Sequence, residues 1–286
     1  MKLFSKNNTL TPRPLWEFDA GTVLWRIKPD NAGHFLGEAR DPEARICTFF
    51  CIDEHTGAPL WQGLRFEESW WIGIEDAIDG RIFFHGFGKP DMPQHLGIIA
   101  CSIDTAEVLW RETELAFLFY HEGHVYAAEQ RFDTLHFHQL DAATGARVRD
   151  LGDDPAPLNR LRAQLNEEEW FSGYAYPEQF TPGHTEWQQV LDRTQALFDT
   201  AAIVGTVDIL DRGDVRYVAW HEKLTAGGLA QRFAVLDADG RQLMRDTILD
   251  YADAPGMDSF FVKDHQLLYV RNRSVLVAHP VAGRGK

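Results

Sequence analysis

Histidine side chains are the most prominent potential metal ligands in this sequence. The chain has 12 histidines, and two short segments concentrate them, His121-Glu122-Gly123-His124 and His136-Phe137-His138. If both segments are strands, imidazoles two residues apart share a face and could converge on a metal ion. The spacing matches no established ligand motif, and the zinc-protease pattern needs a longer spacing on a helix. We therefore expect histidines on solvated strand faces, with no metal site and no cofactor.

Cysteine is the second residue type that could bind a metal or form a redox pair. The sequence contains three cysteines, Cys47, Cys51 and Cys101. Cys47 and Cys51 are four residues apart, which places both on one face of a strand. A thiolate site would need more ligands of this kind nearby. We expect reduced, buried thiols, which are typical of a cytoplasmic protein.

Acidic residues could supply general acid–base chemistry. Paired carboxylates, such as Glu67-Glu68 and Asp153-Asp154, are the groups that glycosidases use. With 43 acidic residues in the chain, spacing alone selects no catalytic pair. Two function classes therefore stay open. The first is a non-catalytic binding protein, and the second is a carbohydrate-active hydrolase with carboxylates in a central funnel.

The charge balance narrows the classes of partner. Lys and Arg total 28 against 43 Asp and Glu, which gives a formal net charge of −15. Such a surface repels nucleic acid and anionic membranes on average. The N-terminal segment has no signal-peptide pattern, and no run approaches the roughly 18 apolar residues of a membrane helix. We expect a cytoplasmic protein whose partner is a protein or a small molecule, and the oligomeric state is not assigned.

A repeated turn indicates how the chain is built. An apolar strand leads into an Asp-led turn, which is followed by a strand with a bulky residue at its end. The copies begin at Asp53, Asp104, Asp141 and Asp237. Asp bonds backbone amides two residues on, and Gly supplies the positive φ of a tight hairpin. The pattern is most complete from Asp53 to Trp61, where Thr-Gly and Leu-Trp are both present.

This unit resembles the quinoprotein-type (PQQ-like) β-propeller repeat, whose pattern is a strand, Asp-x-x-Thr-Gly, and a strand that ends on Leu-Trp. The resemblance implies an all-β propeller. It does not imply the quinone cofactor, because quinoprotein dehydrogenases have more blades and often adjacent cysteines. Three further segments look like those of an uncharacterised bacterial propeller-like family, which brings no activity with it: Glu38-Ala39-Arg40-Asp41, Trp70-Trp71-Ile72-Gly73-Ile74-Glu75 and Pro93-Gln94-His95-Leu96-Gly97.

Counting strands favours a five-bladed propeller in one domain, residues 1–286. The last unit shows three clear strands, so Pro14–Phe18 is predicted to complete it beside Val275–His279. A competing interpretation makes Thr22–Ile27 that outer strand. Asp141 and Asp237 are two repeats apart, which permits a sixth blade. We favour instead a helical insertion at residues 153–200, with helices near Leu158–Leu165 and Trp187–Phe198, separated by the Gly- and Pro-containing stretch Gly173–Gly183.

Propeller geometry places the loops between the second and third strands of each blade on one face. The insertion emerges on the same side, and we expect it to form a lid over the channel near Arg131 and His221. A funnel on that face is the default ligand site. The candidate ligand-binding residues are Arg40, Glu68, His95, Arg131, Tyr176 and His221.

Overall fold

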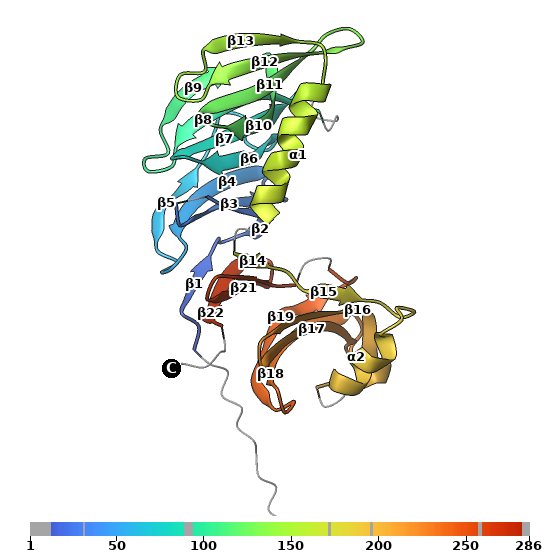
Figure 1. The fold of residues 1–286 in the computed structure, drawn as a ribbon. Helices are drawn as coiled ribbons and strands as arrows, with labels where there is room; N and C mark the ends of the chain where they lie inside the picture. The colour runs from blue at the N-terminus through green and yellow to red at the C-terminus, as the bar shows by residue number, and fades with distance from the viewer. Residues whose placement is uncertain are drawn as a thin grey trace, which may run out of the picture. The chain divides into compact units, whose positions relative to one another are not determined.

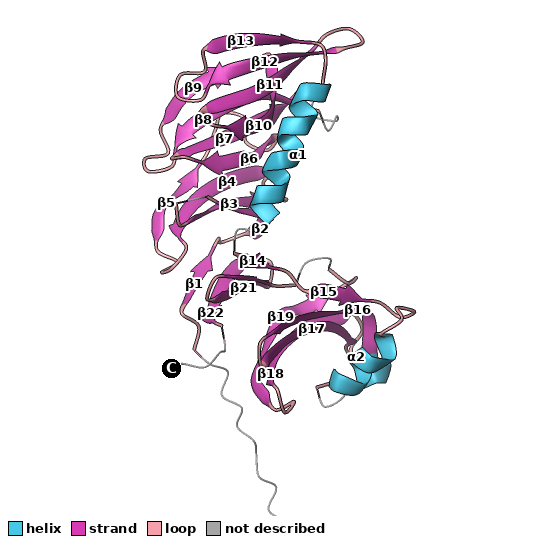
Figure 2. Cartoon of the chain, in the orientation of Figure 1, coloured by secondary structure: helices cyan, strands magenta, loops and turns pink. Residues whose placement is uncertain are grey.

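The chain forms an all-β protein of antiparallel sheets with two α-helices (Figures 1 and 2). The computed structural model describes residues 13–30, 32–88, 94–170, 173–194, 197–256 and 259–281, without the side chains of 166–170. The chain divides into two compact units. The first is Ala20–Ser172, and the second combines Met1–Asp19 with Gly173–Lys286. Each unit has its own sheets and its own apolar core.

The first unit contains three four-stranded sheets, each a simple meander in chain order (Figure 1). Their strands lie where the hydrophobic alternation and the turn residues predict them. The first sheet comprises β2 (Val23–Pro29), β3 (His34–Asp41), β4 (Ile46–Asp53) and β5 (Pro59–Leu64). The second comprises β6 (Ile72–Ile78), β7 (Arg81–Phe87), β8 (His95–Ser102) and β9 (Val108–Glu112). The third comprises β10 (Leu115–His121), β11 (His124–Gln130), β12 (Leu135–Asp141) and β13 (Arg147–Gly152).

The second sheet is apolar on both faces. Neighbouring residues of a strand point to opposite faces, so Phe84 packs into a core shared with the first sheet and Phe83 into one shared with the third. Phe49 of β4 lies in the former core, and Val125 of β11 in the latter. The three sheets are therefore held face to face by two separate apolar layers.

The three cysteines lie together in the layer between the first two sheets. Cys47 and Cys51 share a face of β4, as their spacing predicts, and Cys101 joins them from β8. All three are free and at most 1% exposed. Burial raises the pKa of Cys47 and Cys51 to about 12 and that of Cys101 to about 11. The thiols are thus packing groups.

We predict that a thiol reagent modifies none of these cysteines in the folded protein. The nucleophile is the thiolate, which burial disfavours at all three positions. The measurement counts labelled thiols by mass spectrometry before and after denaturation, with three expected only after it. Rapid labelling of any one thiol at neutral pH in the folded state would contradict the buried packing.

The repeated turns share one pattern of hydrogen bonds. Asp53 Oδ1 accepts from the amides of His55 and Thr56 at 3.0 and 2.8 Å. Asp141 does the same for the amides of Ala143 and Thr144 at 3.1 and 2.8 Å. A side-chain acceptor at the first position thus closes each turn.

The prediction that Asp104 leads the turn of the second sheet is wrong. Ser102 leads it, since its hydroxyl accepts from the amide of Thr105 at 3.4 Å and its own amide donates to Glu107 at 2.9 Å. Ala106 adopts a φ of 60°, in the left-handed region that Gly145 uses in the third sheet at 73°. Counted from Ser102, the turn is as long as the one that begins at Asp53.

Tryptophans on the outer strands connect each sheet to the turn of the next. The indole of Trp61 on β5 donates to the carbonyl of Ile103 at 2.6 Å, and that of Trp110 on β9 donates to Ala142 at 2.9 Å. Gly145 makes room for the second contact, because a Cβ there would lie 2.7 Å from the Trp110 ring. The Leu-Trp at the end of a repeat therefore fixes one sheet against its neighbour.

Helix α1 (Ala156–Trp170) packs against the face of the third sheet that points away from the second. Asp154 accepts from the amide of Ala156 at 3.0 Å and caps the helix start. Leu158 packs on Phe119 and Phe137, as its helical spacing predicts. Neither helix in the described part of the chain has the length and apolar character to cross a lipid bilayer.

The second unit contains two five-stranded sheets. One is ordered β15 (Glu178–Phe180), β16 (Ile203–Arg212), β17 (Val215–Lys223), β18 (Leu229–Asp237) and β19 (Gln242–Ala252). The other is ordered β1 (Trp16–Asp19), β22 (Val275–Pro280), β21 (Gln266–Arg271), β20 (Phe261–Lys263) and β14 (Tyr174–Ala175). Tyr217, Phe233 and Tyr269 belong to the core that joins them.

The N-terminal strand β1 completes the last sheet, as the missing strand predicts. It pairs antiparallel with β22, with Trp16 opposite Ala278 and Phe18 opposite Leu276. Both aromatic side chains are buried, at 6% and 7% exposure. The competing prediction for Thr22–Ile27 is wrong, because β2 is the first strand of the first sheet.

The segment 153–200 is less purely helical than predicted. Its described part contains α1, α2 (Trp187–Thr194) and a short 3₁₀ helix, Thr200–Ala202. The stretch expected only to separate two helices forms β14 and β15, which pair with β20 and β16. Helix α2 ends before Phe198, but Leu197 and Phe198 still pack against the sheet. Residues 171–172 and 195–196 lie outside the described ranges.

We predict that Trp16→Ala lowers the free energy of unfolding by about 3–5 kcal/mol, because it empties a buried aromatic site in the strand that closes the last sheet. The neighbouring Leu15 is 54% exposed, so Leu15→Ala is the matched control and should change it by less than about 0.5 kcal/mol. Urea unfolding measures both. Equal effects of the two substitutions, or no effect of deleting residues 1–20, would contradict the role assigned to β1.

Candidate functional site

Three polar side chains meet at one end of the second sheet. Glu75 comes from β6, His85 from β7 and His95 from the start of β8. The strand register shifts between Ile74 and Asp76, where Glu75 lies, and again beside His85. Such irregularities redirect side chains out of the regular ladder. They bring together groups from three consecutive strands.

The two imidazoles share one carboxylate oxygen. His95 Nδ1 donates to Oε1 of Glu75 at 2.7 Å. His85 Nδ1 lies 3.0 Å from the same oxygen, but it is not aligned as a hydrogen bond. The rings stack with centroids 3.5 Å apart and 7° between their planes. The ring of Phe87 meets both edge-on, at 5.1 and 5.2 Å.

Burial differs across this group and leaves one side open. The side chain of His85 is 4% exposed, that of Glu75 15% and that of His95 37%. Burial raises the pKa of Glu75, but the contacts with His85 and His95 outweigh it and hold the pKa below the ordinary value. Glu75 is therefore an ionised acceptor at neutral pH, reachable from solvent beside His95.

A buried ion pair lies next to this group. Glu38 is 1% exposed, and its Oε1 accepts from Nε of Arg40 at 2.5 Å. Arg40 also donates to the carbonyls of Trp70 and Ile72 at 2.8 and 2.6 Å. Its guanidinium lies 5.0 Å from the ring centre of Trp70 and 5.8 Å from that of Trp25. Arg40 thus ties the first sheet to the segment that enters the second.

Gly73 joins the ion pair and the histidines into one cluster. A Cβ at this position would lie 2.8 Å from Cε1 of His85 and 3.2 Å from Oε2 of Glu38. Only glycine leaves space for both groups. The polar cluster is defined here as Glu38, Arg40, Glu75, His85 and His95.

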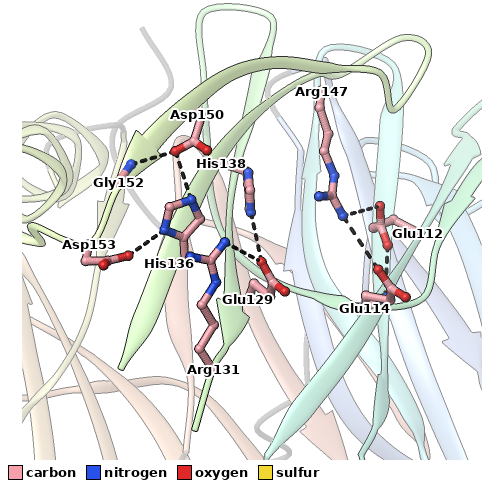
Figure 3. A network of polar contacts seen from close by, with 10 residues as sticks. All are labelled: Glu112, Glu114, Glu129, Arg131, His136, His138, Arg147, Asp150, Gly152 and Asp153. Atoms are coloured by element: carbon pink, nitrogen blue, oxygen red, sulfur yellow. Dashed lines mark hydrogen bonds and ion pairs between the residues drawn. The ribbon is translucent and has the colours of Figure 1, made fainter. Parts of the chain in front are cut away.

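A second polar network lies on the third sheet of the same unit (Figure 3). His136 lies between two carboxylates, with Nδ1 donating to Asp153 and Nε2 positioned 2.8 Å from Asp150 Oδ1. Glu129 contacts His138 at 3.4 Å and Arg131 at 3.2 Å. In Figure 3, His136 points toward Asp150 and Asp153, whereas His138 points toward Glu129.

The carboxylates around His136 favour its charged form. The hydrogen bond to Asp153, followed by the contact with Asp150, raises the pKa of His136 above its ordinary 6.5. The same contact lowers the pKa of Asp150. Both ring nitrogens therefore carry protons and face acceptors. This arrangement is an ion-pair clamp between β12 and the start of the segment that leads to α1.

We predict that this clamp weakens as the pH rises. A raised folded-state pKa contributes stability that is complete below the unfolded value of about 6.5 and is lost as the pH rises through the folded value. Titration of His136 by NMR should give a pKa that falls in Asp153→Asn. The exposed loop residue Asp133 provides the control, Asp133→Asn. Equal titration of His136 in both variants would contradict the clamp.

The structure brings three of the sequence-predicted residues together. Arg40, Glu68 and His95 all lie around the segment Trp70–Glu75, at the end of the first two sheets where the predicted loop face would be. Glu68 Oε1 accepts from the amides of Trp70 and Trp71 at 2.9 Å each, which lowers its pKa. Glu68 and Arg40 thus bond the backbone of this segment, while His95 is partly exposed and contacts Glu75. Pro93 lies outside the described residues.

The four histidines considered together in the sequence do not form one group. His121 and His124 are paired across the β10–β11 hairpin and contact Glu122. His136 lies opposite Glu129, at the far end of β11. Arg131 lies at that far end too, where it contacts Glu129.

The remaining two predicted residues belong to the second unit. His221 on β17 is 2% exposed, and its Nε2 accepts from the amide of Gly256 at 3.1 Å. Desolvation lowers its pKa. Tyr176 is 59% exposed and stacks on Tyr174. It lines a pocket of about 370 Å³ between α2 and the β15–β17 strands. His221 is not among the residues that line this pocket.

Helix α2 packs on the face of its own sheet. Val190 is buried against Val207 and Trp220, and Trp187 packs at the margin of the same core. The lid over Arg131 and His221 stays a prediction.

Sequence reasoning missed Glu38, Glu75 and His85 as members of a site. Glu75 and His85 each follow an apolar residue in their strands, Ile74 and Phe84, and Glu38 is 1% exposed despite its charge. A charged residue is rarely buried without a partner. A polar or charged residue at a strand position that is expected to be buried is the signal that could have identified them.

Comparison with known families gives one match. Residues 29–110 match the sequence model of a family described as a domain of unknown function, DUF4905. This span contains every residue of the polar cluster. The quinoprotein-type resemblance stays a prediction, since the matching family is a different one. No curated protein matches the chain.

Comparison with solved structures gives matches of low identity. A member of the DUF4221 family from Bacteroides vulgatus is 14% identical, with a TM-score of 0.27, and covers 90% of this chain and 77% of that one. An endo-arabinase from Bacteroides thetaiotaomicron is 12% identical, with a TM-score of 0.30 and coverage of 96% and 98%. An exo-β-1,3-galactanase from Phanerochaete chrysosporium is 8% identical, with a TM-score of 0.28 and coverage of 93% and 64%. None of these similarities identifies a function for this chain.

Proposed function

We propose that the protein is a non-catalytic binding protein that takes a small polar ligand at the polar cluster. The observation that carries the proposal is the convergence of Glu75, His85 and His95 on one partly open point. Burying such groups costs free energy that packing alone does not repay. The ligand class that fits an ionised acceptor is a molecule with hydroxyl or ammonium donors.

Aromatic residues beside the cluster support a binding role. Trp25 is 65% exposed, and both it and Trp70 flank the guanidinium of Arg40. Large exposed aromatics next to fixed polar groups are typical of ligand sites. Arg40 holds these rings in place, so a ligand would meet a largely preformed surface.

Two carboxylates at this end, Glu68 and Glu75, favour binding over hydrolysis. A glycosidase needs one carboxylic acid whose pKa is raised so that it can donate a proton. The pKa of Glu75 is lowered, and so is that of Glu68. Both are acceptors, and neither has the protonated form that a general acid requires.

The proposal extends to the architecture. We propose that the five sheets are the blades of a single propeller domain, residues 1–286, built on quinoprotein-type repeats, with residues 153–200 inserted. The repeated contact between an outer-strand tryptophan and the next turn supports it, as does the entry of β1 into the last sheet. Three buried free thiols are compatible with a cytoplasmic location. The net charge of −15 disfavours nucleic acid and membranes as partners.

Side-chain NMR of histidine tests the binding role. The probes are neutral monosaccharides and disaccharides, small alkylamines and small carboxylates, added to chelator-treated protein. We predict that a sugar or an amine shifts the His85 and His95 signals and leaves His136 unchanged. Glu75→Gln should abolish the shift because it removes the charged acceptor. Glu43 is exposed on the loop after β3, so Glu43→Gln is the matched control.

Two outcomes would contradict the proposal. One is a panel in which no probe moves His85 or His95, or in which Glu75→Gln responds like Glu43→Gln. The other is turnover of chromogenic glycosides that Glu75→Gln abolishes. That result would make the protein a hydrolase.

A further inference from the structure

We infer that Glu75, His85 and His95 form a site for a divalent first-row transition-metal ion, of the kind that zinc occupies. The inference rests on the proposed function, because it names one ligand of the same site. It replaces the expectation of no metal site, which considered only ligands close together in the sequence. The three residues are spaced ten apart on three different strands.

The donor atoms are close enough to share an ion. One ligand atom from each residue lies within 4.8 Å of the other two. The two nitrogen–oxygen separations are 2.7 and 3.0 Å. Ligands at about 2.0–2.2 Å from a tetrahedral zinc ion lie roughly 3.3–3.5 Å apart. An ion therefore fits once the donors separate by about 0.3–0.8 Å and one imidazole tilts out of the stack, because imidazole binds a metal in the plane of its ring.

The donor types suit such an ion. Two imidazoles and a carboxylate are ligands of zinc and of iron(II). Both imidazoles already lie close to the same carboxylate oxygen, so the donor atoms converge on one point. His85 Nδ1 is buried without a hydrogen bond, although it points toward the carboxylate.

The surroundings provide the support that metal ligands need. Nε2 of His85 and Oε2 of Glu38 would both lie close to a Cβ on Gly73, at 3.0 and 3.2 Å. The two groups therefore flank the same glycine. Phe87 restricts the rotation of both rings. The 37% exposure of His95 leaves one coordination position facing solvent, where a polar ligand could bind the ion.

The second histidine group of this unit does not share these properties. His136, His138 and Asp150 also lie within 4.8 Å of one another. However, the carboxylate of that group, Asp150, is 67% exposed, whereas Glu75 is 15% exposed, and Asp150 and Asp153 already hold the His136 ring between them. We therefore assign the metal to the polar cluster.

Cobalt(II) is the probe that tests the assignment. Full-length protein is purified without a metal-affinity step, treated with a chelator and titrated with Co²⁺. We expect one equivalent to bind, with visible absorption from nitrogen and oxygen ligands, and Zn²⁺ to displace it. His95→Ala and Glu75→Gln should each weaken binding at least about tenfold, the lower bound for disturbing a metal site. His95 is partly exposed, so its variant should fold, which circular dichroism checks.

Two variants serve as controls. His55→Ala removes a histidine of the same unit that is 70% exposed and outside the cluster, and it should bind Co²⁺ like the unchanged protein. His138→Ala should do the same. The inference is overturned if no stoichiometric Co²⁺ binds, if His95→Ala and Glu75→Gln bind as the controls do, or if His138→Ala alone loses the ion.

The two proposals fail separately. If sugars or amines shift His85 and His95 in metal-free protein but no Co²⁺ binds, the metal assignment fails and the proposed function stands. If Co²⁺ binds as expected but no small molecule shifts those signals with or without Zn²⁺, the small-molecule function fails and the metal site stands.

Discussion

The hydrogen bond from an outer-strand indole to the turn of the next sheet is the interaction on which the first unit depends. Trp61 and Trp110 each direct one polar hydrogen at a carbonyl and bury a large ring beside it. Apolar layers are nondirectional, so they hold sheets together without fixing how far one slides over the next. The indole contact removes that freedom. Strand ends from different sheets consequently meet at defined positions.

The polar cluster uses this alignment. Glu38 and Arg40 lie near the end of β3, while Glu75, His85 and His95 lie at the matching end of the second sheet. Arg40 crosses between the sheets to the carbonyls of Trp70 and Ile72. A shift of one sheet would break these bonds and leave a buried charge without its partners, which costs more than the pair contributes. The cluster and the stacking of the sheets therefore depend on each other.

The two histidine groups show how environment decides the role of the same residue type. At His136, exposed carboxylates on both sides of the ring favour the cation, so the group works as an ion pair. At His85, burial and a carboxylate shared with His95 favour an arrangement of donor atoms around one point. Spacing along the sequence made His136 and His138 candidate metal ligands, because residues two apart on a strand share a face. The group of Glu75, His85 and His95 forms instead because side chains from three separate strands converge.

The amino-acid sequence by itself determined the strands, most of the turns and the buried thiols. Alternation of apolar residues, Asp-led turns and the four-residue spacing of Cys47 and Cys51 are local properties, and the side-chain period of a strand makes them readable. The last unit shows only three strands of its own, and this missing strand predicted that β1 completes the last sheet. Arg40, Glu68 and His95 were proposed from the loop geometry of a propeller, and their role as ligand-binding residues stays a prediction.

Tertiary structure alone decided the rest. Ser102 stands at the head of its turn in place of Asp, and backbone hydrogen bonds to Glu107 and from Ala106 close the hairpin around it. Residues around Tyr174 and Phe180 become strands because the sheet edges at β20 and β16 offer partners. Glu75, His85 and His95 meet because of two register shifts and a glycine that lets side chains approach. Contacts between residues on separate strands depend on how the strands pair, which no local pattern of residue types encodes.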